Sequence, residues 1–95
     1  MTARHENYQY PLNEMWTTAE IITVTTFYRQ IEAANEATVV TAELLAAYQA
    51  FKTVVPAKSE EKQLSREFEA AAGLNIYRTM QAAQATNTRR FKYRI

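Results

Sequence analysis

The stretch Trp16-Thr17-Thr18-Ala19-Glu20-Ile21 carries the clearest folding signal in this chain of 95 residues. The Thr17 hydroxyl is placed to accept a hydrogen bond from the Glu20 amide, while the Glu20 carboxylate reaches back to the Thr17 N–H. Trp16 and Ile21 stand at the two positions of a hydrophobic staple around this capping box. The stretch therefore predicts the start of an α-helix at Thr17.

Apolar residues recur at helical spacing beyond this start and predict a first helix that runs to about Ala37. Its apolar stripe consists of Ile21, Val24, Phe27, Tyr28, Ile31 and Ala34. A second helix is predicted to start at Thr41, with Val40 and Leu45 as a staple pair, and to stop before Pro56, which disfavours the helical conformation at Val55. Its stripe consists of Leu44, Tyr48, Phe51 and Val55.

A third helix is predicted from Ser59 as N-cap, because Glu60 and Glu61 would then face the positive end of the helix dipole. Its core face consists of Leu64, Phe68 and either Ala71 or Ala72. Gly73, the only glycine, suits the left-handed position that ends a helix, and Asn75 can cap the next one. The apolar residues Ile76, Met80 and Ala83, with Tyr77 beside them, predict a shorter fourth helix. Their helical pattern ends near Thr86.

Two flanking segments alternate between apolar and polar residues, which is typical of extended chain. They contain Tyr8, Tyr10 and Leu12 before the first helix and Phe91, Tyr93 and Ile95 after the fourth. The fold class predicted is all-α, a small irregular bundle of three to four short helices with extended N- and C-terminal segments. We expect residues 1–95 to form a single helical domain, with a core over about 8–86 and a basic tail over 89–95.

The composition favours a small soluble protein of the cytoplasm. The chain is 47% hydrophobic and 22% charged, and it has no cysteine, so neither a disulfide framework nor a thiolate metal site is available. No apolar run approaches the roughly 18 residues of a membrane-spanning helix, and MTARHENYQY at the start lacks the apolar region of a signal peptide. We therefore expect no membrane association.

The chain lacks most residues from which active sites are built. It has no cysteine or aspartate, and His5 is its only imidazole, so a thiol nucleophile and a histidine-centred triad are excluded. A single glycine excludes a glycine-rich phosphate loop. Glu60 with Glu61, or Glu67 with Glu69, would be the remaining carboxylate pairs, but neighbours one or two positions apart on a helix point in different directions. We expect no enzyme activity, no cofactor and no metal.

Three features have both a functional and a purely structural interpretation. The first is a set of cations spaced four residues apart, Lys58, Lys62 and Arg66. On a helix they would form a basic ridge that binds a phosphate or an acidic partner. The alternative is a solvated face whose charge nearby glutamates offset. The aromatic and apolar cluster near the N-terminus forms either a docking surface or a strand that drapes over the bundle. This cluster consists of Tyr8, Tyr10, Leu12, Met15 and Trp16.

The third feature is the C-terminal tail, RRFKYRI, which carries about +4 while residues 1–88 carry about −3. Its cations are Arg89, Arg90, Lys92 and Arg94. Interleaved with Phe91 and Tyr93, they have the composition of an arm that pairs with phosphates and stacks on bases, a candidate polyanion-binding site. The alternative is that the apolar side of the tail packs on the bundle or on a second subunit.

The stretches YPLNEMWTTAEI and AYQAFKTVVPAKSEEKQLSREFEAAAGLNIYR resemble the YktA-like uncharacterised protein family (family 0223) of low-GC Gram-positive bacteria. The resemblance covers most of residues 8–78 and implies a small helical domain. It implies no activity, ligand or catalytic residue.

These observations rank three hypotheses of function. The first is a non-enzymatic interaction module that binds an unidentified protein partner or itself. The second is weak nucleic-acid or ribosome binding through the tail, and an enzyme is a distant third.

Overall fold

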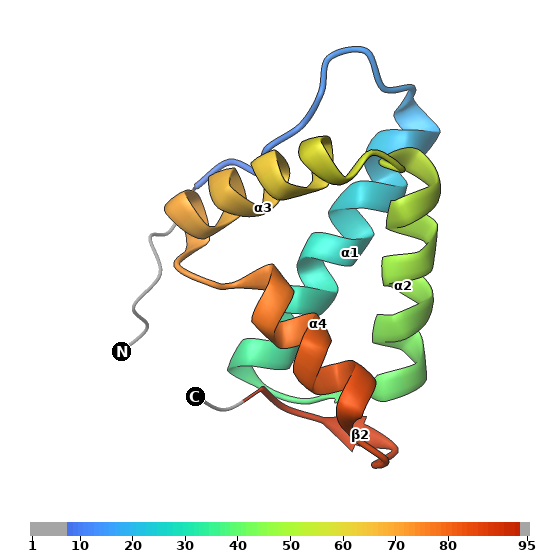
Figure 1. The fold of residues 1–95 in the computed structure, drawn as a ribbon, viewed down its shortest axis with the longest axis vertical. Coiled ribbons are helices and arrows are strands. Elements are labelled where there is room, and N and C mark those ends of the chain that lie inside the picture. Colours follow the sequence, from blue (N-terminus) through green and yellow to red (C-terminus); the bar gives the residue numbers. More distant parts are fainter. Residues whose placement is uncertain (1–7, 94–95) are drawn as a thin grey trace.

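The computed structural model describes residues 8–93, and this part of the chain forms four helices and a small antiparallel sheet of two strands (Figure 1). In chain order the elements are α1 (Thr18–Glu36), β1 (Val39–Val40), α2 (Thr41–Val54), α3 (Lys58–Ala72), α4 (Ile76–Ala85) and β2 (Arg90–Phe91). The predicted all-α bundle with extended flanking segments is confirmed.

Helices α1 and α2 form the base on which the other two are placed. A short connection returns the chain from α1 to α2, and the two helices pack along each other (Figure 1). Helix α3 begins near the end of α2 and crosses close to the start of α1, and α4 then runs back over α1 and α2. Helices α3 and α4 are therefore placed against the pair formed by α1 and α2.

The predicted capping box at the start of α1 is present. The Glu20 amide donates to Thr17 Oγ1 at 3.1 Å, and the Thr17 amide donates to Glu20 Oε1 at 2.9 Å. Both donors would otherwise lack partners in the first turn. The helix ends with Ala37 as C-cap, at the predicted residue.

Helix α2 starts at Thr41 as predicted, but the expected staple is wrong, because Val40 is itself the N-cap. The Thr41 hydroxyl donates to the Thr88 carbonyl at 2.9 Å. The predicted N-cap of α3 is also wrong. Helix α3 starts at Lys58 with Ala57 as N-cap, two residues ahead of the predicted N-cap Ser59. Neither N-cap side chain forms a capping hydrogen bond, so tertiary contacts rather than local capping hold these two helix starts.

The junction between α3 and α4 follows the prediction. Gly73 has a φ of 75°, in the left-handed region that glycine adopts without steric cost. Asn75 caps α4, with its Oδ1 accepting from the Arg78 amide at 2.7 Å. The turn that directs α4 back along the bundle is thus specified locally.

The predicted apolar stripes form the core, with three departures. Ile21 and Tyr48 are half-buried, and Tyr77 is 69% exposed. In α4 the fully buried neighbour of Met80 is Thr79, whose hydroxyl donates to the Asn75 carbonyl at 2.8 Å. The largest side chains without exposed area are aromatic or branched: Tyr28, Phe27, Phe51, Phe68, Ile31, Leu44, Val24 and Val55.

The N-terminal segment drapes over the bundle through its aromatic rings. Tyr10 lies 5.1 Å from Tyr28 and 6.3 Å from Phe68 between ring centroids, and its hydroxyl donates to Glu32 Oε1 at 2.8 Å. Tyr8 and Trp16 also pack against the core. Leu12 and Met15, the other members of the cluster, are 46% and 87% exposed.

The C-terminal tail packs on the bundle through its apolar residues. Phe91 is 8% exposed and pairs with Val39 across the sheet, and Tyr93 also contacts the core. The Thr41 amide donates to the Arg89 carbonyl and the Tyr93 amide to the Ala34 carbonyl, both at 2.8 Å. The core therefore extends beyond the expected limit at residue 86, because strand pairing brings Phe91 back to the bundle.

We predict that Thr17→Ala lowers the free energy of unfolding by about 1 kcal/mol, since the Glu20 amide loses its capping acceptor. The control is Thr26→Ala, at an exposed position inside α1, where alanine should be neutral or slightly stabilising. Urea unfolding of the three proteins measures both effects. Equal midpoints for Thr17→Ala and wild type would contradict the capping box.

We predict that Phe91→Ala destabilises the fold by on the order of 3 kcal/mol, because it removes a buried ring from the core. Lys92→Ala, at the exposed neighbouring position, should stay within about 0.5 kcal/mol of wild type. Thermal unfolding would show a melting point several degrees lower for Phe91→Ala alone. If the two variants melted together, the tail would not be part of the core.

Candidate functional site

A groove with a volume of about 750 Å³ lies between α3 and α4 and reaches Tyr48 of α2. One side is formed by α3, which contributes Lys58, Lys62 and Arg66. The other side and the floor are formed by α4, which contributes Ile76, Tyr77 and Met80. The groove combines the predicted basic ridge with an apolar surface that the sequence did not connect to it.

The ridge side of the groove carries cations without partners among residues 8–93. Lys58, Lys62 and Arg66 are exposed, and none of them forms an ion pair or side-chain hydrogen bond within that range. Two nearby glutamates on α3 bond to neutral amides, Glu67 to Gln63 at 3.0 Å and Glu69 to Asn75 at 3.3 Å, and so keep their own charge. The groove lining holds the three cations of the ridge against the two carboxylates of Glu61 and Glu69.

The α4 side of the groove has no charged residue. Ile76 and Met80 are only 3% and 4% exposed and form the floor, while the Tyr77 ring stands at the rim. Gln81 and Gln84 continue the rim along α4. A ligand lying in the groove would thus meet cations on one side and apolar or amide groups on the other.

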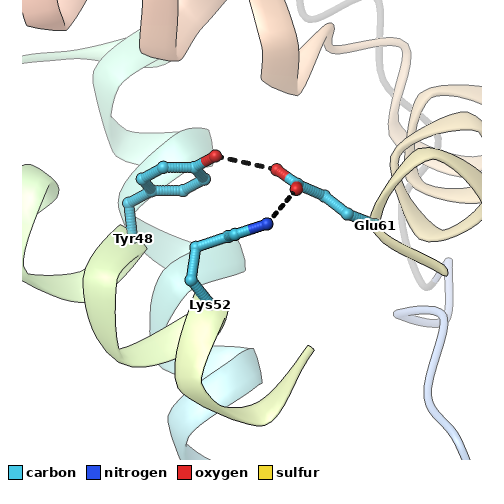
Figure 2. Close-up of polar contacts among 3 residues, drawn as sticks. All are labelled: Tyr48, Lys52 and Glu61. Atoms are coloured by element: carbon cyan, nitrogen blue, oxygen red, sulfur yellow. Dashed lines mark hydrogen bonds and ion pairs between the residues drawn. The ribbon is translucent and has the colours of Figure 1, made fainter. Parts of the chain in front are cut away.

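A polar network at the α2 end ties α3 to α2 (Figure 2). Figure 2 shows the Tyr48 and Lys52 side chains of α2 converging on the Glu61 carboxylate of α3. The Tyr48 hydroxyl donates to Glu61 Oε2 at 2.8 Å, and Lys52 Nζ lies 2.5 Å from Glu61 Oε1. Both oxygens of Glu61 are occupied and its charge is balanced, so this carboxylate does not neutralise the ridge.

The network changes the acidity of Tyr48. Burial raises the pKa of its hydroxyl to about 12, with further contributions from the hydrogen bond to Glu61 and from the charge of that carboxylate. The neutral phenol, which is the form that donates to Glu61, is therefore the form present at neutral pH.

Of the other candidate residues within the described range, Glu61 and Glu69 line this groove and the rest do not. Arg89, Arg90 and Lys92 are exposed near β2 and do not line the groove, and Arg94 and His5 lie outside the described residues. The glutamates considered as catalytic pairs each have separate partners; Glu60, for example, accepts from Asn13 at 3.2 Å.

The described residues contain neither a metal-binding cluster nor a membrane-spanning helix. From residue 8 to residue 93, no three histidine, cysteine or acidic side chains are grouped so that they could hold a metal ion. In the same range no helix has the length and apolar character needed to cross a membrane.

Sequence reasoning found the ridge but missed the network and the apolar floor. The ridge follows from helical spacing alone. The pairing of Tyr48 with Glu61 spans 13 residues and two helices, and the floor depends on which face of α4 meets α3. One signal was present in the sequence. Tyr48 lies in the apolar stripe of the second helix but carries a hydroxyl, which indicates that this position lies at the edge of the core.

Taken together, the fold and the site define a small all-α protein with a groove that is basic on one side. The chain belongs to the Uncharacterised protein family (UPF0223), whose family model matches residues 7–92. This membership confirms the resemblance seen in the sequence.

Curated members of the family are close relatives of this chain. A UPF0223 protein of Lactiplantibacillus plantarum (strain ATCC BAA-793 / NCIMB 8826 / WCFS1) is 69% identical over 94 residues, which cover 99% of this chain and 97% of the relative. A UPF0223 protein of Streptococcus pneumoniae (strain CGSP14) is 48% identical over 80 residues, covering 84% and 87%. Both organisms are low-GC Gram-positive bacteria.

We predict that Glu61→Gln lowers the pKa of Tyr48 from about 12 toward, but not to, the ordinary 10.0. The carboxylate charge is lost, while burial, the largest cause, remains. Glu67→Gln is the matched control, because Glu67 acts on Tyr28 and not on Tyr48. NMR titration of the Tyr48 ring carbons would follow the three proteins, and an equal pKa in all of them would contradict the network.

The same shift sets the sign of a pH effect on stability. A hydroxyl whose folded-state pKa is raised from 10.0 to about 12 contributes stability fully below pH 10, and this contribution is lost as the pH rises through 12. The free energy of unfolding of wild type should therefore fall more steeply over this interval than that of Tyr48→Phe.

Proposed function

We propose that this protein is a non-enzymatic interaction module of the cytoplasm that binds a partner protein through the groove between α3 and α4. The observation that carries the proposal is the unpaired cationic ridge beside an apolar floor and an exposed tyrosine. Tyrosine and arginine are enriched where interfaces bind most strongly, and charged rims give such contacts their specificity. The lack of cysteine is consistent with a reducing compartment.

The residue inventory supports binding rather than catalysis. The chain has no cysteine or aspartate, and its single histidine is His5. Each glutamate considered for acid–base chemistry has a structural partner of its own, such as Asn13 for Glu60 and Lys52 for Glu61. General acid–base catalysis by a carboxylate pair requires two such groups to face one substrate. Glu61 and Glu69 both line the groove, but Glu61 is held by Tyr48 and Lys52, and Glu69 accepts from Asn75.

The tail supports the second hypothesis, nucleic-acid binding, less well than the groove supports the first. Arg89, Arg90 and Lys92 are exposed and available to phosphates. However, Phe91 is buried in the core and Tyr93 is half-buried against it, so these rings are not free to stack on bases. Self-association through the groove remains within the proposal, with a second copy as the partner.

Photo-crosslinking in cells tests the proposal directly. With p-benzoylphenylalanine in place of Tyr77 at the groove rim, we expect an adduct with a polypeptide that survives nuclease treatment. With the same group in place of Ile22, which is 59% exposed on α1 and does not line the groove, we expect no such adduct. Mass spectrometry of the adduct identifies the crosslinked peptide of the partner.

Three outcomes would contradict the proposal. Equal adducts at both positions would show non-selective contact, and no adduct at position 77 would remove the groove as the binding site. A purified enzymatic activity that Glu61→Gln abolishes would overturn the non-enzymatic part.

A further inference from the structure

We propose that the groove takes an acidic segment of its partner, with carboxylates on Lys58, Lys62 and Arg66 and an apolar side chain over Ile76 and Met80. The inference rests on the proposed function and deepens it, because it specifies the chemistry of the partner. Its occupant is a peptide segment rich in aspartate or glutamate that also contains a large apolar residue.

The charge of the groove selects for acidic ligands. Three cations and two carboxylates line it, and one of these carboxylates, Glu61, is balanced by Lys52. The local charge is therefore positive, although residues 1–88 contain ten acidic and seven basic side chains. A basic segment would meet three unpaired cations, whereas an acidic segment would pair with them.

The spacing of the ridge sets a scale for the partner. Residues four apart on a helix are separated by about 6 Å along its axis, so Lys58, Lys62 and Arg66 span about 12 Å. Carboxylates two residues apart in an extended peptide are separated by about 6.6 Å, and those four apart in a helix by about 6 Å. An acidic segment of five to nine residues therefore matches the whole ridge.

The apolar part of the groove accounts for the second requirement. Met80 has a flexible, polarizable side chain that adapts to different apolar partners, and Ile76 lies beside it in the floor. The Tyr77 ring is 69% exposed at the rim and offers apolar area together with a hydroxyl. An apolar side chain of the partner placed between these residues would remove that ring from water.

A protein ligand fits this surface better than a nucleic acid. A nucleic-acid strand carries a charge at every phosphate, and in this groove it would also meet the carboxylate of Glu69. A peptide can leave that position uncharged and place its carboxylates only along the ridge. The α4 rim, with Gln81 and Gln84, adds no cation to the groove for phosphates to pair with.

The test is selection of a random 12-residue peptide library on the full-length protein, followed by fluorescence anisotropy of the selected peptides. We expect enrichment of peptides with several aspartate or glutamate residues and one large apolar residue. Reversal of two ridge charges, Lys62→Glu with Arg66→Glu, should weaken their binding about tenfold, and Tyr77→Ala about fivefold. Both reversed side chains are exposed, and within residues 8–93 neither forms a hydrogen bond or an ion pair.

The matched control is Arg78→Glu with Arg89→Glu, which makes the same change of charge at exposed positions outside the groove and should leave affinity within about twofold. A single-stranded RNA 12-mer serves as the second probe, and we expect it to bind at least tenfold more weakly than the selected peptides. Raising the salt concentration should weaken the binding of the selected peptides to the wild-type protein but not to the ridge variant.

The outcomes separate this inference from the proposed function. Selected peptides that lose affinity in Tyr77→Ala but are neither acidic nor sensitive to charge reversal would overturn the acidic partner and leave the groove as the binding site. Tight RNA binding that the ridge reversal abolishes would replace the peptide with a phosphate ligand. An equal loss of affinity in the matched control would overturn the role of the ridge. If the selection gave no peptide whose binding depends on the groove, both proposals would be overturned.

Discussion

The ring of Tyr28 lies where α1, α3 and the N-terminal segment meet. It stacks on Phe68 with 4.9 Å between centroids and 16° between planes, and its hydroxyl donates to the Pro11 carbonyl at 2.9 Å. The side chain has no exposed area, and this burial, with a smaller contribution from the charge of Glu67, raises its pKa well above the ordinary value. One buried residue thus joins three segments that are far apart in the sequence.

The position of the groove follows from this junction. With 3.6 residues per turn, Arg66 lies about 200° around α3 from Phe68, so fixing Phe68 against Tyr28 turns the ridge away from the core. The network of Tyr48 and Lys52 with Glu61 then holds the start of α3 against α2. The turn at Gly73 and the cap at Asn75 direct α4 to form the other side. Packing inside the bundle therefore determines the face presented to a ligand.

Local chemistry predicted some of these features and long-range contacts decided the others. The capping box of Thr17 and the turn at Gly73 depend on residues within a few positions, and both were readable from the sequence. The hydrogen bond from the Thr41 hydroxyl to the Thr88 carbonyl, 47 residues away, could not be predicted from local sequence. For the site, helical spacing predicted the ridge, but nothing local indicated that Ile76 and Met80 would lie opposite it.

Hydrogen exchange of a Phe68→Leu variant, which keeps an apolar side chain but loses the ring stack, tests the central claim that the Tyr28 junction positions α3. We predict that amide exchange accelerates most in α3 and the segment of residues 8–13, while α1 and α2 keep most of their protection. Uniform acceleration across all four helices, or unchanged exchange in α3, would show that the junction does not hold α3 and the groove in place.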